Sequence, residues 1–239
     1  MRSNAVFCNY AQQFTDMKKI LLALFSICFA ISLFAQKKNE DKITIETEYG
    51  KIVLALYENT PKHRDNMMKL VKDKFYDSTL FHRVIPTFVI QGGDPDSKKA
   101  APGQGLGEGD LGYKVPAEIN SVNFHRRGAL GMARDNNPEK ASSACQFYIV
   151  VGRKYTDDEL NNISSKTGRK FTPVQRSIYK TQGGTPHLDG NYTVYGIVEE
   201  GMDIVDKIAN EARNPADRPD KDIKMIKVRM KKKKKFLLF

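Results

Sequence analysis

The sequence has few of the residues that most often carry chemistry. It contains three cysteines and four histidines in 239 residues. Only Cys145 lies beyond residue 35, where we expect a leader to end, so an oxidising compartment would find no intramolecular disulfide to form. The histidines are scattered along the chain, at His63, His82, His125 and His187. They show no metal-ligand spacing, and Cys145 has no obvious histidine partner, so neither a metal site nor thiol catalysis is predicted.

Long apolar runs are also missing, with one exception. Ile20–Ala35 is a 16-residue apolar stretch that follows Met17-Lys18-Lys19 and precedes the polar letters QKKNEDK. This layout is typical of a secretory signal peptide cleaved after Ala35. An uncleaved membrane anchor is the less favoured alternative, because a helix needs ~20 apolar residues to cross the hydrocarbon core. We therefore expect residues 1–35 to be an N-terminal extension and signal peptide, and the protein to be exported, to the periplasm.

Acidic residues are outnumbered, since 28 Asp and Glu face 39 Lys and Arg and the net charge is +11. Five of the positive charges form the run Lys231–Lys235 near the C-terminus. A terminal lysine run is more typical of a solvated tail than of a nucleic-acid site. We expect no nucleic-acid partner, and weak attraction to an anionic membrane surface is the alternative. Residues 36–230 would then form one domain, and residues 231–239 a basic tail.

Short strand-like segments dominate the rest of the chain. Ile43–Thr47 and Lys51–Tyr57 flank a tight turn and predict a hairpin. Helices are predicted from Thr60-Pro61 onward, with Phe75 on the apolar face, and over Gly201–Asn210. Further strands are predicted at Thr79–Val84, Thr87–Gln91, Ala129–Met132, Gln146–Val151, Thr193–Val198 and Ile223–Met230. Many short strands with few helices predict a mainly β fold, a closed antiparallel barrel rather than a parallel α/β sheet.

One glycine-rich run resembles a phosphate-binding loop at first sight. Gly103–Gly109 reads GQGLGEG, which fits neither G-x-G-x-x-G nor a Walker A motif. We interpret it as a flexible surface loop.

The most informative segment is Phe81–Pro95, FHRVIPTFVIQGGDP, in which a cation sits among aromatic and aliphatic residues. Three further blocks follow it: GALGMAR at Gly128–Arg134, SACQFYIV at Ser143–Val150, and HLDGNYTVYGIV at His187–Val198. Taken in this order, the four blocks resemble the cyclophilins over Ile43–Met230. The resemblance implies a closed eight-stranded antiparallel barrel capped by two helices. It also implies a monomeric peptidyl-prolyl cis/trans isomerase that acts on proline-containing polypeptide clients without a cofactor.

The resemblance also assigns roles to individual residues. Arg83 would donate a hydrogen bond to the proline nitrogen, because its guanidinium stays charged and presents a rigid fork of donors. Gln91 and Gln146 would bind the substrate or steady Arg83. The apolar slot for the proline ring would be lined by Phe88, Met132, Tyr148 and Leu188. The backbone of Arg134 would hold the substrate chain, with His82, His187 and Tyr192 at the rim.

Several positions depart from the family pattern. His187 stands where cyclosporin-sensitive members usually carry tryptophan, so weak cyclosporin binding is expected. Tyr148 replaces phenylalanine, and its hydroxyl needs water or a partner. Residues 155–185 are an insertion that predicts two short helices, capped by Thr156 and Thr172, and we hypothesise that it forms a lip that biases substrate choice.

Two other classes of function stay open. One is a proline-peptide binding module without catalysis, which the presence of Arg83, Phe88 and Gln146 disfavours. The other is a basic protein that works at polyanions or membranes through Lys231–Lys235.

Overall fold

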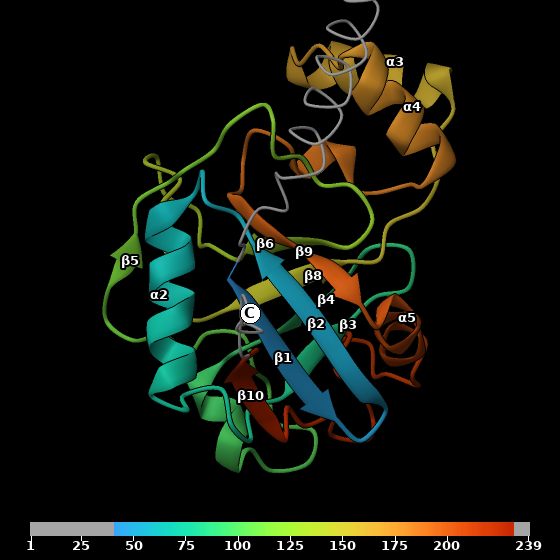
Figure 1. Cartoon of the computed structure of the whole chain (residues 1–239). Coiled ribbons are helices and arrows are strands. Elements are labelled where there is room, and N and C mark those ends of the chain that lie inside the picture. The colour runs from blue at the N-terminus through green and yellow to red at the C-terminus, as the bar shows by residue number, and fades with distance from the viewer. Residues whose placement is uncertain (1–40, 232–239) are drawn as a thin grey trace, which may run out of the picture. The chain divides into compact units, whose positions relative to one another are not determined.

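The computed structural model describes residues 41–231 (Figure 1). The predicted leader and all of the predicted tail except Lys231 lie outside this range. Within it, no helix is both long and apolar enough to cross a membrane.

An eight-stranded antiparallel sheet forms the body of the fold, in the order β10-β1-β2-β9-β6-β8-β4-β3. Its strands are β1 (Lys42–Thr47), β2 (Gly50–Leu56), β3 (Phe81–Val84), β4 (Val89–Gly92), β6 (Ala129–Met132), β8 (Phe147–Val150), β9 (Val194–Glu200) and β10 (Lys227–Met230). A separate pair is formed by β5 (Lys114–Val115) and β7 (Ser142–Ser143). The mainly β, antiparallel prediction is therefore confirmed.

The barrel is not fully closed, which corrects the prediction. The end strands β3 and β10 share no ladder. The segments that precede them are joined by the isolated bridge between Leu80 and Lys224, with hydrogen bonds from Ser78 N to Met225 O (2.8 Å) and from Phe81 N to Ile223 O (2.9 Å). The hydrogen-bonding partner of the chain changes at residue 226. The backbone of residues 223–225 is hydrogen-bonded to residues 78–81, whereas β10 pairs with β1. The predicted strand from Ile223 is shortened for this reason.

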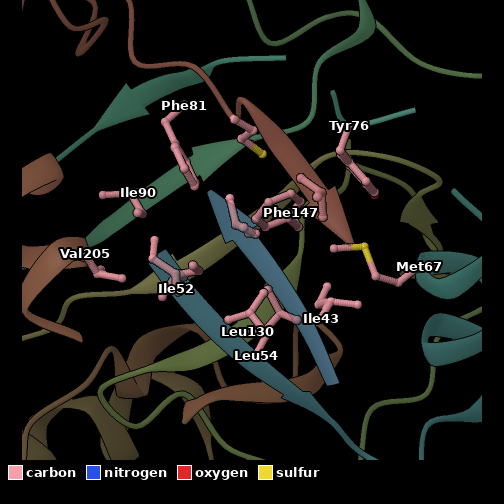
Figure 2. Packing of buried hydrophobic residues seen from close by; sticks show 14 of the residues in the cluster. Ile43, Ile52, Leu54, Met67, Tyr76, Phe81, Ile90, Leu130, Phe147 and Val205 are labelled. Carbon is pink, nitrogen blue, oxygen red and sulfur yellow. The ribbon is translucent and has the colours of Figure 1, made fainter. Parts of the chain in front are cut away.

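The main core lies on one face of the curled sheet, because alternate strand residues point to the same side. Figure 2 shows Ile52, Leu130 and Phe147 among the side chains that meet there, with Met67 and Val205 approaching from two sides. Met67 comes from α2 (Pro61–Lys72) and Val205 from α5 (Met202–Ala209). These two helices confirm the predicted caps.

The start and end of α2 differ in detail from the prediction. Thr60 stands at the N-cap position but makes no capping hydrogen bond with its side chain. The helix ends at Lys72, so Phe75 lies in the turn that follows rather than on the helical face.

The insertion forms the two predicted helices, α3 (Asp157–Thr167) and α4 (Pro173–Thr181). Each begins with a capping box, made by Thr156 with Glu159 and by Thr172 with Gln175. Four buried residues give the insertion an apolar cluster of its own: Tyr155, Leu160, Phe171 and Tyr179. Two short 3-10 helices, η1 (Pro95–Lys99) and η2 (Pro186–Leu188), complete the fold, and η2 leads the chain from the insertion back to the sheet.

Candidate active site

The candidate site is built on a row of residues that crosses five neighbouring strands. Register places these residues opposite one another in the order Arg83, Gln91, Tyr148, Gly131 and Val194, on β3, β4, β8, β6 and β9. Their sequence neighbours, such as Ile90 and Phe147, pack into the main core. Because side chains alternate along a strand, the row lies on the opposite, outer face of the sheet.

An apolar cluster on this outer face forms the slot. It gathers Phe88, Val89, Ala129, Ala133, Tyr148, Val150, Leu188, Tyr192, Val194 and Tyr57. Three of the predicted slot residues, Phe88, Tyr148 and Leu188, are therefore brought together. Met132 is not, because it shares the inward direction of Leu130 on β6 and is completely buried in the main core. Val89 is a buried member of the slot cluster that the sequence analysis missed.

Arg83 lies at the edge of this cluster, with 41% of its side chain exposed. The centre of its guanidinium is 5.9 Å from the centroid of the Phe88 ring. Its Nε is 3.6 Å from Oδ2 of Asp217, an acidic residue in the loop after α5 that the sequence analysis did not single out. Asp217 is held in turn by the bond from Val84 N to its carbonyl (2.9 Å), so this loop is fastened to β3 beside Arg83.

Gln91 and Gln146 bond to each other instead of to Arg83. Gln91 Nε2 donates to Gln146 Oε1 at 3.1 Å. Gln146 Nε2 donates to the carbonyl oxygens of Gly107 (2.8 Å) and Gly109 (2.7 Å). The pair thus connects the row on the sheet to the glycine-rich loop.

The glycine-rich loop is part of the site and not a detached surface loop. Gly107 N donates to the side chain of Asp94, and a Cβ on Gly109 would lie 2.2 Å from Oδ1 of the same residue. Arg218, which is 4% exposed, donates to the carbonyl oxygens of Ala101 and Gln104. Between the loop and the sheet lies a pocket of about 270 Å³, lined by Arg83, Gln91, Arg218 and their neighbours.

The two histidines expected at the rim lie in different surroundings. His82 is 4% exposed under the glycine-rich loop, and neither ring nitrogen has a hydrogen-bond partner among residues 41–231. Burial, together with the nearby charges of Arg83 and Arg218, lowers the pKa of His82 to about 4, so the ring is neutral at pH 7. His187 is exposed and stacks on Phe88, with the ring centroids 5.5 Å apart. Partial desolvation of the ring lowers the pKa of His187 as well.

The hydroxyl of Tyr148, which was expected to need water or a partner, has a partner within the protein. It lies 2.8 Å from Nε2 of His125, a residue that the sequence analysis placed in no site. Tyr148 fits because Gly131 faces it on β6: a Cβ on that glycine would fall 2.3 Å from Cζ of the tyrosine ring. The space left by Gly131 and the hydrogen-bond partner offered by His125 therefore allow a tyrosine at this position of the slot.

Arg134 and Tyr192 support each other at one end of the slot. The guanidinium carbon of Arg134 is 5.1 Å from the centroid of the Tyr192 ring, and Arg134 Nε donates to Asn191 O at 2.8 Å. The Tyr192 ring meets that of Tyr148 edge to face, with centroids 6.0 Å apart.

Metal and thiol chemistry find no support in residues 41–231. No group of three or more His, Cys, Asp or Glu residues in this range could hold a metal ion. Cys145 is fully buried, and burial raises the pKa of its thiol to about 11. The thiol is therefore protonated at pH 7 and is a poor nucleophile.

The family model of the cyclophilin type peptidyl-prolyl cis-trans isomerases matches residues 42–230. The chain belongs to this family. A candidate peptidyl-prolyl cis-trans isomerase of Staphylococcus saprophyticus is 34% identical over 186 residues, which cover 77% of this chain and 89% of that protein. A candidate bifunctional phosphatase/peptidyl-prolyl cis-trans isomerase of Streptococcus pyogenes is 36% identical over 188 residues, but these are 76% of this chain and only 37% of that longer protein.

The fold of this cyclophilin also agrees with a solved structure. The crystal structure of a cyclophilin type isomerase of Cryptosporidium parvum superposes with a TM-score of 0.60, at 23% identity, over 81% of this chain and 99% of that one. The predicted mainly β cyclophilin fold is thereby confirmed, with the barrel not fully closed. By its family model and its curated relatives, the enzyme is a cyclophilin-type peptidyl-prolyl cis-trans isomerase.

Proposed function

We propose that this cyclophilin holds the proline ring of an X-Pro bond in the apolar slot while Arg83 donates a hydrogen bond to the proline nitrogen. A peptide bond resists rotation because resonance gives its C–N bond partial double-bond character, with a barrier of ~20 kcal/mol. In the twisted state the nitrogen regains its lone pair, so a donor aimed at it binds the transition state better than the planar ground state.

The observation that carries this proposal is the position of Arg83 beside the slot. Its Nε is next to Asp217, and its guanidinium lies over the Phe88 ring at the edge of the apolar cluster. Since the Asp217 pair involves Nε, the two terminal nitrogens are available to a substrate. A hydrogen bond from a charged donor is worth ~1.5 to 3 kcal/mol, which corresponds to about one to two powers of ten in rate. The slot must supply the rest by fixing the ring.

The test replaces Arg83 and measures isomerisation of an X-Pro peptide. Arg83→Ala should lower kcat/KM by about tenfold to a hundredfold. Arg83→Lys should recover only part of the loss, because it keeps the charge but not the planar fork. Arg64→Ala is the matched control, since Arg64 lies on α2 and pairs with Asp65. An inactive wild type, or an Arg83→Ala variant with full activity, would contradict the proposal.

The same measurements separate catalysis from binding alone. A proline-peptide binding module would bind the peptide in a titration but leave its isomerisation rate at the uncatalysed value. Binding without acceleration in the wild type would therefore favour the module over the enzyme.

We further propose that the clients are exported polypeptides with slow prolyl steps, and that the enzyme meets them in the periplasm as a monomer. This rests on the signal-peptide pattern of Met17–Ala35. Expression of the full chain in a bacterium with two membranes, followed by N-terminal sequencing of the periplasmic fraction, should find a chain that begins at Gln36. Retention of the unprocessed chain in the cytoplasm would contradict this part of the proposal.

A further inference from the structure

A chain of buried hydrogen bonds runs from the wall of the slot into the insertion. Tyr148 Oη lies 2.8 Å from His125 Nε2, and His125 Nδ1 lies 2.7 Å from Asp189 Oδ1. The other oxygen of Asp189 accepts a hydrogen bond from the hydroxyl of Tyr179, at 2.7 Å. Tyr179 belongs to α4, so the chain connects the insertion to a residue that faces the proposed substrate.

The donors and acceptors along this chain can be assigned. The side chain of Asp189 is fully buried, and it accepts from the backbone N of His125 (2.8 Å) and from Tyr179, with Nε of Arg169 3.9 Å away. A carboxylate only accepts, so Nδ1 of His125 carries the proton that is shared with Asp189. In a neutral imidazole Nε2 is then an acceptor, and the hydroxyl of Tyr148 donates to it.

Packing around Tyr148 leaves its ring little freedom. The His125 ring lies beyond its hydroxyl and nearly parallel to it, with an interplanar angle of 13° and centroids 6.0 Å apart, and the Tyr192 ring meets it edge to face. Gly131 lies against the tip of the ring. The hydrogen bond at the hydroxyl therefore fixes a ring that already has these neighbours in contact with it.

The insertion reaches the slot at two points. Asp189 directly follows Leu188, which is a member of the slot cluster, so the residues that hold Asp189 also hold the chain at Leu188. Both outer partners of Asp189, Arg169 and Tyr179, come from residues 155–185. Two residues of the slot, Tyr148 and Leu188, are thus both fastened to Asp189, one through His125 and the other through the backbone.

We propose that the α3–α4 insertion determines how the slot holds the proline ring, with Tyr179, Asp189 and His125 as positioning residues for Tyr148 and Leu188. The inference rests on the proposed isomerase function. It assigns the insertion a structural link to the site, in addition to any contact of its surface with a client.

A double-mutant cycle tests the link. Tyr179→Phe removes one hydroxyl but keeps the ring in the apolar cluster of the insertion, and Asp189 keeps its bonds to His125. We expect kcat/KM to fall by about twofold to thirtyfold, the range seen for mutations along packed networks. In a Tyr148→Phe background the same change should have a clearly smaller effect, because the connection through His125 is already broken and only the one through Leu188 is left. Tyr155→Phe is the matched control, since its ring is in the same cluster and its hydroxyl is outside the chain.

An equal effect of Tyr179→Phe in both backgrounds, or none in the wild type, overturns the inference. Separate values of kcat and KM show whether substrate binding or the isomerisation step depends on the position of Tyr148. A second readout needs no activity: the ¹⁵N shifts of His125 should report a proton on Nδ1 and none on Nε2, and Tyr179→Phe should move the ring resonances of Tyr148 while Tyr155→Phe leaves them in place. An inactive wild type rejects the proposed function, whereas unmoved Tyr148 resonances reject the link.

Discussion

His82 should make the protein lose stability as the pH falls. The ring is 4% exposed and lies near two arginines, and its pKa is lowered to about 4, whereas a histidine in an unfolded chain titrates near ~6.5. Between these values the unfolded chain takes up a proton that the folded protein does not. The stabilising contribution is therefore complete above pH ~6.5 and is lost as the pH falls through about 4.

The size of the effect follows from the same two values. At ~1.4 kcal/mol per tenfold change in proton affinity, the difference between ~6.5 and about 4 corresponds to roughly 3 kcal/mol of unfolding free energy. The pKa of His63 is also lowered by burial, and several carboxyl groups are held below their ordinary pKa, so the wild type loses additional stability in acid. The contribution of His82 to this loss of stability is therefore isolated by comparing the wild type with a variant at this position.

Urea denaturation of the wild type and of His82→Leu, measured from pH 7.5 to pH 3.5, makes this comparison. Leucine removes the titration and both nitrogens that lack a partner, and it keeps the site apolar. The difference in unfolding free energy between the two proteins should shift by roughly 3 kcal/mol in favour of the variant across this range. His187→Leu is the control, and its shift should be smaller because that ring is exposed. A His82→Leu difference that stays constant with pH would refute the reasoning.

Three further predictions concern single positions. Asp217→Asn should lower kcat/KM by about twofold to tenfold, because Arg83 would be less well ordered without its partner. Loss of an exposed ion pair of this kind should change the unfolding free energy by less than ~1 kcal/mol. Unchanged kinetics would mean that the pair does not position Arg83. Gly131→Ala should destabilise the protein by about 1 to 3 kcal/mol in urea denaturation, because the new methyl group meets the Tyr148 ring; an equally stable variant would show that the ring can move aside. Cys145 should resist iodoacetamide in the folded protein and react in urea, as mass spectrometry of its peptide would show, and rapid labelling without urea would contradict its burial.

Local sequence patterns predicted the elements of the fold well. The helices of the insertion are capped by Thr156 and Thr172, as predicted, because a threonine side chain at the N-cap position accepts from a free N–H group of the helix start. β6 has its predicted bounds, Ala129–Met132. The strand predicted at Ile223–Met230 ends where expected but starts only at Lys227, because the tertiary fold alone decides which neighbour each residue bonds.

The site was predicted less completely, for two physical reasons. Met132 was assigned to the slot by family similarity, although strand alternation places it on the side of Leu130, away from Gly131 and the row. His125 and Asp189 are 64 residues apart, and no spacing rule brings them together. The one available signal was the hydroxyl of Tyr148, which required a partner that the sequence alone could not name.

The segment that covers the edge of β3 restricts how another polypeptide can bind to the sheet. β3 carries Arg83 and ends the sheet, so its outer edge would be open to any extended polypeptide. Residues 217–225 occupy that edge instead, through the bonds from Val84 N to Asp217 O and from Phe81 N to Ile223 O. The edge of β3 is thereby closed to an extended polypeptide, which could otherwise add to the sheet as a further strand and be held there. Under the proposed function, a proline-containing client would therefore bind at the slot and not as an added strand on β3.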